Sequence, residues 1–176
     1  MARRDDEGFV EFAAARRDRL RRTAYLMCGD WHRSSDIVQE ALIRVYVAWP
    51  RLERKEGLTA YARRAVVSVA IDQSRRRSST ELPSEVGDQA PATDDVAGGV
   101  ADRDLLMRAL ASLPKRQRAC VVLGYYEDLP VAEVATALGV NEGTVKSQTS
   151  RALASLKEMF EAHDHEALLV TNEGGA

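Results

Sequence analysis

Apolar residues recur at helical spacing along nearly the whole chain, and this periodicity limits the fold more than any other feature. Phe9, Phe12, Leu20, Ala24 and Met27 fall on one face of a predicted first helix, which ends near Gly29. Residues three, four and seven positions apart share a face of an α-helix. No stretch alternates apolar and polar residues between turn residues, as the strands of a β-hairpin do. The sequence therefore predicts an all-α fold.

Two further helices are predicted before residue 78. Ser34 and Ser35 are candidate N-caps of the second helix, which must end before Pro50. Thr59 is a candidate N-cap of the third helix. The predicted buried residues of the two helices are Ile37, Ala41, Val45, Ala48, Ala62, Ala65, Val66, Val69 and Ala70.

A polar segment divides the chain into two parts. Residues 79–102 are rich in Ser, Thr, Pro, Gly, Ala and acids, and hold almost no large apolar side chain. Such a segment cannot bury enough surface to offset the entropy of ordering it, so we expect a flexible acidic linker. The predicted domains are residues 1–78 and 103–163, each a small helical unit, and an acidic tail over 164–176 is expected to be disordered.

The formal net charge of −2 hides alternating basic and acidic blocks. Residues 1–80 carry a net charge of +6 and residues 81–102 a net charge of −6. Residues 103–160 carry +2 and residues 161–176 carry −4. This asymmetry predicts an anionic partner for the basic segments.

Several protein classes are excluded by what the sequence lacks. No run of 18 apolar residues is present, so we expect no membrane insertion. The charged N-terminus has no apolar stretch behind it, which argues against a signal peptide and for a cytoplasmic protein. Cys28 and Cys120 lie far apart without CxxC spacing, so we interpret them as reduced thiols packed as small apolar groups.

Residues 131–155 have the pattern of a helix-turn-helix. Ala135 is small where two helices must cross, Gly139 permits the sharp turn, Asn141 is a good N-cap, and Val145 locks the second helix to the first. The opposite face offers hydroxyls, an amide and cations that suit phosphates and base edges: Thr144, Lys146, Ser147, Gln148, Ser150 and Arg151. An ordinary helical hairpin with a solvated polar face is the alternative, but the agreement of spacing, cap and composition favours DNA binding.

The third helix is basic along its length and at its end. Arg63 and Arg64 lie on it, and residues 75–77 are three consecutive arginines that must fan outward as a phosphate-binding rim. Cations that complement a helix C-terminus would give the same run, so the arginines alone leave both interpretations open. The nearby aromatic residues are more typical of a core than of base stacking: Trp31, Tyr46, Trp49 and Tyr61.

Taken together, four segments of the chain resemble the extracytoplasmic-function (group 4) sigma factors of the sigma-70 family, in the actinobacterial SigE-like branch. They are DIVQEALIRVY at 36–46, YARRAVVSVAIDQSRRR at 61–77, LPKRQRA with YYEDL at 113–129, and GTVKSQTSRAL at 143–153. The resemblance implies a region 2 domain and a region 4 domain. It also implies a protein that binds core RNA polymerase, directs it to promoters and assists promoter melting, with no cofactor and no catalytic residue.

The resemblance also assigns roles to individual residues. It implies that the polymerase β′ subunit is bound by Asp36, Gln39, Glu40 and Arg44. It implies that the minus-ten element, melted during initiation, is bound by Arg63, Arg64, Ser68, Asp72, Arg75, Arg76 and Arg77, with Ser68 where many members have Asn. For the duplex minus-thirty-five element it implies Arg118, Thr144, Lys146, Ser147, Gln148, Ser150 and Arg151, in a domain that also touches the β subunit. Many members of the family are held inactive by an anti-sigma factor, which is a possible further partner.

Three other functions are alternatives to this one. A homodimeric helix-turn-helix regulator would explain residues 131–155 but not the resemblance in the first eighty residues. An enzyme would need a motif such as HExxH, GxSxG or a P-loop, and none occurs. His163 and His165 lie in the predicted tail and are not expected to bind a metal. A sequestered adaptor protein remains open, and tail deletion would show whether residues 164–176 are regulatory.

Overall fold

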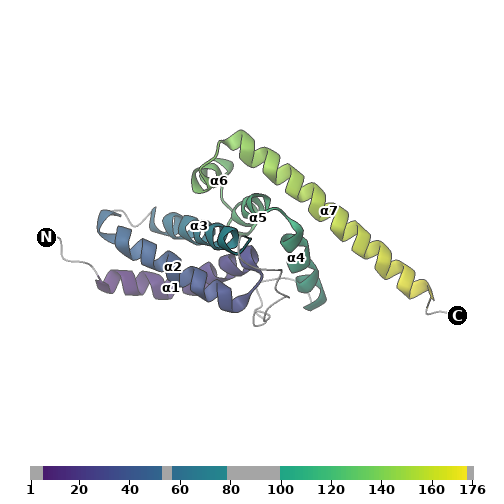
Figure 1. Ribbon diagram of the computed structural model, residues 1–176, viewed down its shortest axis with the longest axis horizontal. Helices are drawn as coiled ribbons and strands as arrows, with labels where there is room; N and C mark the ends of the chain where they lie inside the picture. The colour runs from purple at the N-terminus through teal and green to yellow at the C-terminus, as the bar shows by residue number, and fades with distance from the viewer. Residues whose placement is uncertain (1–5, 53–56, 79–99, 174–176) are drawn as a thin grey trace.

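The computed structural model describes residues 6–52, 57–78 and 100–173, which are almost entirely helical (Figure 1). For residues 77, 78, 100 and 166–173 the structure describes the backbone but not the side chains. No residue in the described ranges forms a β-strand, and the predicted all-α class is confirmed. The predicted linker falls almost wholly outside the described residues, because only its last three residues belong to the next helix.

The N-terminal half, residues 6–78, is a three-helix unit. Its helices are α1 (Asp6–Cys28), α2 (Trp31–Ala48) and α3 (Leu58–Ser78), with a short 3₁₀ turn η1 (Trp49–Arg51) after α2. Each helix contacts the other two, because each turns an apolar stripe inward. Ile37, Val45, Val66 and Val69 are completely buried, as the periodicity predicts. Trp49 and Tyr61 pack against this core, which agrees with their interpretation as core aromatics.

The start of α2 differs from the prediction. The helix begins at Trp31, and Asp30 is its N-cap, accepting a hydrogen bond from the backbone N–H of Arg33 at 2.9 Å. Ser34 is already inside the first turn and donates its hydroxyl to the carbonyl oxygen of Trp31. The prediction that Ser34 or Ser35 caps the helix is therefore wrong. Asp30 follows Gly29, whose φ of 75° turns the chain between α1 and α2, so an equally good cap residue lay one turn earlier.

The C-terminal half, residues 100–173, contains four α-helices. These are α4 (Val100–Ser112), α5 (Lys115–Val121), α6 (Val131–Leu138) and α7 (Glu142–Glu173), and a π-helical turn η3 (Val122–Tyr126) continues α5. A cluster of six buried residues joins α4, α5 and α7: Ala109, Leu110, Leu113, Val121, Ala152 and Leu156.

Helix α7 is longer than the sequence pattern indicates. The periodicity predicts an end near residue 161 and a disordered tail from 164, whereas α7 continues to Glu173. The disordered-tail prediction is wrong over this stretch. No glycine or proline interrupts residues 144–173, and hydrogen bonding within the helix does not require an apolar face, so the helix can extend past the last core contact. Figure 1 shows the C-terminal part of α7 extending beyond the other helices, with the start of α1 and the end of α7 at opposite ends of the molecule.

The two halves pack against each other through a shared apolar core, which is distinct from the cluster that joins α4, α5 and α7. A single cluster of buried residues includes Leu20 and Val67 from the N-terminal half and Ala119, Leu123 and Val134 from the C-terminal half. Helix α1 contacts α4, α5 and η3, and α3 contacts α5 and α6 (Figure 1). This arrangement brings the predicted promoter-reading helix α3 next to the helix-turn-helix.

Candidate nucleic-acid and protein interfaces

The turn between α6 and α7 has the geometry of a helix-turn-helix. Gly139 ends α6 with a φ of 64°, a left-handed conformation that glycine adopts without a side-chain clash. The side chain of Asn141 accepts a hydrogen bond from the backbone N–H of Thr144 at 2.7 Å, so the predicted N-cap is confirmed. Val145 and Ala135 are buried where the two helices meet, as predicted. These contacts fix α7 firmly against α6.

The first turns of α7 present a polar face to solvent. Lys146, Ser147, Ser150 and Arg151 are exposed. Thr144 and Gln148 are half-buried on the same part of the helix. Hydroxyl, amide and cationic groups can donate to phosphate oxygens and to base edges, so this surface is chemically suited to the major groove of DNA.

Arg118 does not lie with these residues. It belongs to α5, is 8% exposed, and donates from Nε to the carbonyl oxygen of Leu26 in α1 at 2.5 Å. Its Nη2 atom is buried and has no hydrogen-bond partner. Burial is the main cause that lowers the pKa of Arg118 to about 10, with a smaller contribution from the nearby charge of Arg33, so the group stays protonated at neutral pH. In this arrangement α1 covers the Arg118 side chain, which was predicted to contact DNA.

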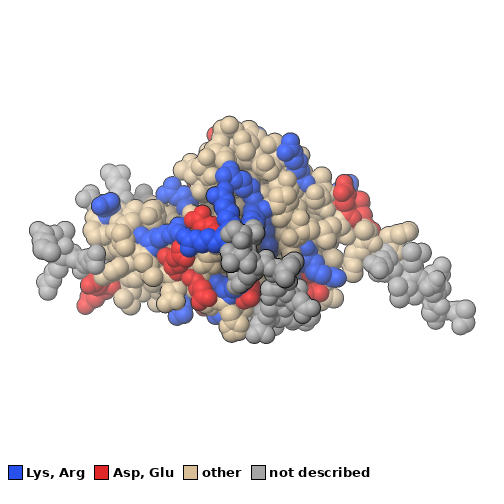
Figure 2. All heavy atoms as spheres, in the orientation of Figure 1, with Lys and Arg blue, Asp and Glu red and all other residues tan. Residues whose placement is uncertain are grey.

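The predicted minus-ten residues are spread along α3. Ser68, Arg75 and Arg76 are exposed, while Asp72 is half-buried. Arg64 is half-buried and lies 5.6 Å from the centre of the Tyr61 ring. The side chain of Arg77 lies outside the described residues. Figure 2 shows Lys and Arg side chains gathered near the centre of one face, about where α3 and α5 meet in Figure 1, with acidic side chains beside them.

Arg63 is engaged by the other half of the molecule. Its Nε lies 2.7 Å from Oε2 of Glu127, a residue directly after η3. The Glu127 side chain is completely buried, and only 19% of the Arg63 side chain is exposed. Nothing in the local sequence marks Glu127 for this contact, because its partners are more than sixty residues away.

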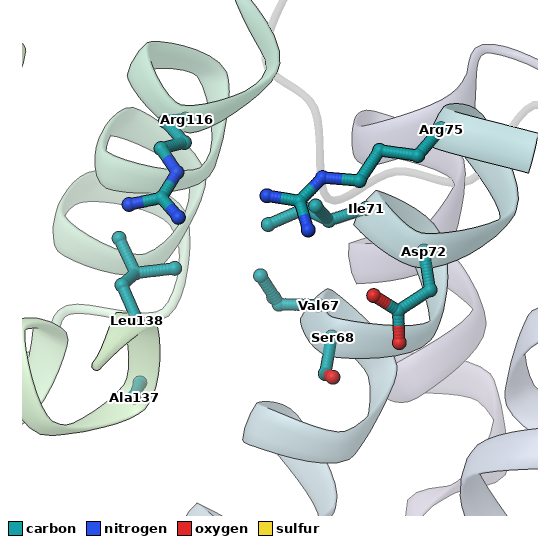
Figure 3. Close-up of a pocket in the computed structure, with 8 residues that line it drawn as sticks. All are labelled: Val67, Ser68, Ile71, Asp72, Arg75, Arg116, Ala137 and Leu138. Atoms are coloured by element: carbon teal, nitrogen blue, oxygen red, sulfur yellow. The ribbon is translucent and has the colours of Figure 1, made fainter. Parts of the chain in front are cut away.

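A small cavity of about 140 Å³ separates α3 from α5 and α6. Ser68, Asp72 and Arg75 line one side, and Arg116 and Leu138 line the other. Figure 3 shows Arg75 and Arg116 pointing toward each other across the cavity, with apolar side chains below them. Two facing guanidinium groups create a positive potential that attracts an anion.

The predicted polymerase-binding residues lie on the outer face of α2. Asp36 and Gln39 are exposed, and Glu40 and Arg44 are about one-third exposed. Arg44 Nη2 lies 2.9 Å from Glu40 Oε1, and Arg44 Nη1 donates to the Ser68 hydroxyl at 3.3 Å. The polar groups assigned to polymerase and to the minus-ten element therefore meet in one network, which the sequence does not reveal.

Glu40 is the acceptor at the centre of this network. The side-chain amide of Gln73 donates to its Oε2 at 3.1 Å, and this hydrogen bond, together with Arg44, lowers the pKa of Glu40. The carboxylate is thus held ionised between α2 and α3. Asp72 also lies 3.7 Å from Arg44, which ties a second acid to the same cation.

An apolar groove lies beside this polar network, and it was not predicted from the sequence. It has a volume of about 420 Å³ and lies between α1 and α2. Ile43 on α2 and Val10 on α1 line it and are 59% and 64% exposed, and Val47, one turn after Ile43, is 65% exposed. The signal was available, because Ile43 and Val47 are apolar residues outside the predicted buried face of this helix. Clustered exposed apolar side chains are typical of a protein-binding surface.

The cysteines and the possible metal ligands in the described residues do not come together in one site. Cys28 and Cys120 are free cysteines in α1 and α5, and burial raises the pKa of both thiols. Within the described residues, no three His, Cys, Asp or Glu side chains are placed to hold a metal ion. A search of the same residues finds no helix with the length and apolar character that crossing a membrane requires.

Comparisons with known proteins agree with this geometry. Residues 12–80 match the family model of sigma-70 region 2, and residues 103–156 match that of sigma-70, region 4. The RNA polymerase sigma-E factor of Streptomyces coelicolor is 38% identical over 165 residues, covering 94% of this chain and 93% of the relative. The ECF RNA polymerase sigma factor SigL of Mycobacterium tuberculosis is 34% identical over 145 residues, covering 78% of this chain and 80% of the relative.

Among solved structures, the fold is similar to that of the sigma factor RpoE from Bartonella quintana in complex with the anti-sigma factor NepR. The TM-score is 0.73 at 22% identity, covering 88% of this chain and 98% of that chain. The two family models fall on the two helical halves, in the order region 2 then region 4. The chain therefore belongs to the sigma-70 family of RNA polymerase sigma factors, in its extracytoplasmic-function group.

Proposed function

We propose that this sigma factor docks on core RNA polymerase through the outer face of α2, and reads a promoter with α3 and the first turns of α7. The polar, exposed start of α7, held by a glycine turn and an asparagine cap, is the observation that supports DNA recognition most directly. The protein is proposed to act in the cytoplasm as an initiation factor. Phosphodiester chemistry belongs to the polymerase, so we assign this chain no catalytic residue, metal or cofactor.

For the minus-thirty-five element, α7 is proposed to enter the major groove of the duplex. Lys146 and Arg151 are exposed and would neutralise phosphates, and Ser147 and Ser150 are short enough for the helix to approach base edges closely. The start of a long helix adds backbone N–H groups that favour a phosphate.

For the minus-ten element, α3 is proposed to hold the melted strand. Arg75 and Arg76 would bind its phosphates, and Ser68 would meet an extruded base. Because Arg44 donates to the Ser68 hydroxyl oxygen, the hydroxyl hydrogen is left to donate to an acceptor on the base. Asp72 lies beside both groups.

For the polymerase, α2 combines a polar strip with an apolar groove. Asp36 and Gln39 supply polar contacts, and Ile43 and Val47 supply apolar area that docking would remove from water. We assign this face to the β′ subunit, and the helix-turn-helix half to additional contact with β. An anti-sigma factor is a possible second partner, since the similar structure of RpoE was solved in complex with one.

The test is run-off transcription from a panel of promoter fragments, with core RNA polymerase from a related bacterium. We expect specific transcripts only when the chain is added. Lys146→Ala should weaken promoter binding and reduce the salt dependence of the affinity by about one unit of slope, because one phosphate contact is lost. Lys157→Ala, three turns along α7 and paired with Glu161 on the surface, is the matched control and should leave both quantities unchanged.

A second pair of variants tests the polymerase contact. Gln39→Arg places a charge beside the apolar groove and should reduce the affinity for core polymerase. Asp18→Arg, on an exposed part of α1 outside that groove, is the control. If the chain shifts duplex DNA but neither binds core nor directs initiation, a homodimeric helix-turn-helix regulator becomes the better explanation.

A further inference from the structure

The contact between the two halves contains one acidic residue that solvent cannot reach. The side chain of Glu127 is completely buried, yet it carries a formal negative charge. Ionised side chains are seldom fully buried unless they are paired, because removing a charge from water is costly. The groups around the Glu127 carboxylate must therefore explain how its charge is tolerated at a buried position.

The backbone around Glu127 is unusual and fixes its direction. The residue follows the π-helical turn η3, and its N–H donates to the carbonyl oxygen of Val122 at 3.1 Å. Asp128, the next residue, has a φ of 53°, a left-handed conformation that costs energy for any residue with a side chain. The N–H of Leu129 then donates to the carbonyl oxygen of Leu123 at 3.1 Å, which closes the turn. π-Turns and left-handed residues often mark functional positions.

Three groups of the N-terminal half bind the Glu127 carboxylate. Arg63 Nε on α3 lies 2.7 Å from Oε2, and Arg19 Nε on α1 lies 3.1 Å from the same oxygen. The hydroxyl of Thr23 on α1 donates to Oε1. Arg19 also donates to the backbone carbonyl oxygen of Tyr126 at 3.3 Å. The carboxylate thus joins the C-terminal half to both α1 and α3.

Two more hydrogen bonds cross the same junction. Lys115 Nζ on α5 donates to the carbonyl oxygen of Ser74 at 2.9 Å, and Arg118 Nε donates to that of Leu26 at 2.5 Å. Leu138 and Arg116 stand opposite Ser68 across the cavity in Figure 3. In this closed arrangement the C-terminal half therefore covers Arg63 and faces Ser68 across the cavity, while the side chains of Ser68, Arg75 and Arg76 stay exposed.

We propose that Glu127 is an autoinhibitory latch, whose carboxylate occupies Arg63 and keeps the C-terminal half closed over α3. This inference rests on the proposed role of α3 in minus-ten recognition. Arginine binds carboxylates and phosphates through the same planar set of donors, so Glu127 holds the cation that a promoter phosphate would need. The outer face of α2 stays accessible, so the closed protein can meet polymerase before it opens on DNA.

The chemistry of the latch is better suited to a reversible contact than to a permanent one. A buried ion pair gives geometric specificity with little net stability, because the pairing energy is largely offset by desolvation. Removing the acid alone leaves a partly buried Arg63 without its counter-charge, which strongly favours the separated halves. We expect Glu127→Gln to raise the ratio of open to closed molecules by about tenfold or more.

The first experiment measures the conformation without polymerase or DNA. Small-angle X-ray scattering of the full chain should give a larger radius of gyration for Glu127→Gln than for the wild type. Glu133→Gln, an exposed acid on α6, is the matched control and should scatter like the wild type. Far-UV circular dichroism must show that each variant is folded. A folded Glu127→Gln protein with unchanged scattering would overturn the latch.

A milder variant covers the case in which Glu127→Gln does not fold. Thr23→Val keeps the shape of a completely buried side chain but removes its hydrogen bond to the carboxylate. It should open the protein in the same direction to a smaller extent, and a folded Thr23→Val protein with wild-type scattering would contradict the proposal.

The second experiment tests whether the closed state inhibits. In run-off transcription, Glu127→Gln should lower the chain concentration needed for half-maximal product by several-fold, with the affinity for core polymerase unchanged. An opened variant that transcribes no better than the wild type would show that the junction is not inhibitory. If neither protein directs initiation, the proposed function fails, and the scattering result still decides whether Glu127 holds the halves together.

Discussion

At the scale of single residues, Arg118 offers a direct test of how an unpaired buried charge affects stability. One hydrogen bond to Leu26 satisfies Nε, whereas Nη2 is buried without a partner. Methionine has a similar length and no charge, so Arg118→Met should raise the free energy of unfolding by about 1 kcal/mol. Urea denaturation measures this difference.

The control for Arg118 is an arginine whose charge is solvated. Arg108 is 59% exposed and pairs with Asp104 one turn away. Arg108→Met should change the free energy of unfolding by less than about 0.5 kcal/mol, because exposed ion pairs contribute little. A clear loss of stability in Arg118→Met would mean that its bond to Leu26 outweighs the cost of burying the guanidinium.

Local rules predicted some of these residues and could not predict others. Asn141 and Gly139 were identified from sequence because a cap and a left-handed turn depend on their immediate neighbours. Asp30 was missed because Ser34 and Ser35 satisfy the same rule a few residues later. The roles of Arg118 and Glu127 in the junction depend on partners more than sixty positions away, which no local pattern encodes.

At the scale of helices and turns, two glycines should respond in opposite directions to the same substitution. Gly124 lies in η3 with open space where a Cβ would be placed, so Gly124→Ala should stabilise the protein by about 0.5–1 kcal/mol. Gly139 also has open space, but its φ of 64° disfavours any side chain. Gly139→Ala should therefore destabilise by about 1 kcal/mol. Chemical denaturation of both variants tests backbone conformation separately from packing, and equal shifts would contradict this explanation.

The helices themselves were largely predictable, but their ends were not. Apolar periodicity located the buried faces of α2 and α3, because burial and periodicity have the same physical cause. The same method ended α7 near residue 161, where the apolar face stops, although the helix continues to Glu173. An exposed helical extension leaves no periodic signal, so only the absence of glycine and proline indicated it. The exposed Ile43 and Val47 were not predicted to form a binding surface, because apolar periodicity identifies the buried face of a helix and not its exposed face.

At the scale of the whole molecule, the sequence indicated two domains and their order, but not their packing. The matches to region 2 and region 4 show both domains and their order, while the boundary that the linker composition and the two motif sets indicate stays a prediction. The shared core could not be foreseen, because Leu123 and Val134 complete the cores of both halves at once. An apolar residue that is buried within one domain looks the same in sequence as one that is buried between two.

The shared core makes a prediction about how the chain unfolds. Each half is small, and burial of apolar surface between them contributes to the stability of both. We therefore expect one cooperative transition in urea rather than two. Both tryptophans, Trp31 and Trp49, lie in the N-terminal half, so their fluorescence reports on that half alone, while far-UV circular dichroism reports on all helices.

In the wild-type protein the two signals should give the same midpoint and the same slope. In Glu127→Gln the junction is weakened, so the fluorescence and dichroism midpoints should separate as each half unfolds by itself. Glu133→Gln should keep them together, since that carboxylate is exposed on α6. Midpoints that already differ in the wild type would show that the halves are energetically independent despite their contact. In that case neither the latch nor the apolar cluster would contribute enough free energy to couple the unfolding of the two halves.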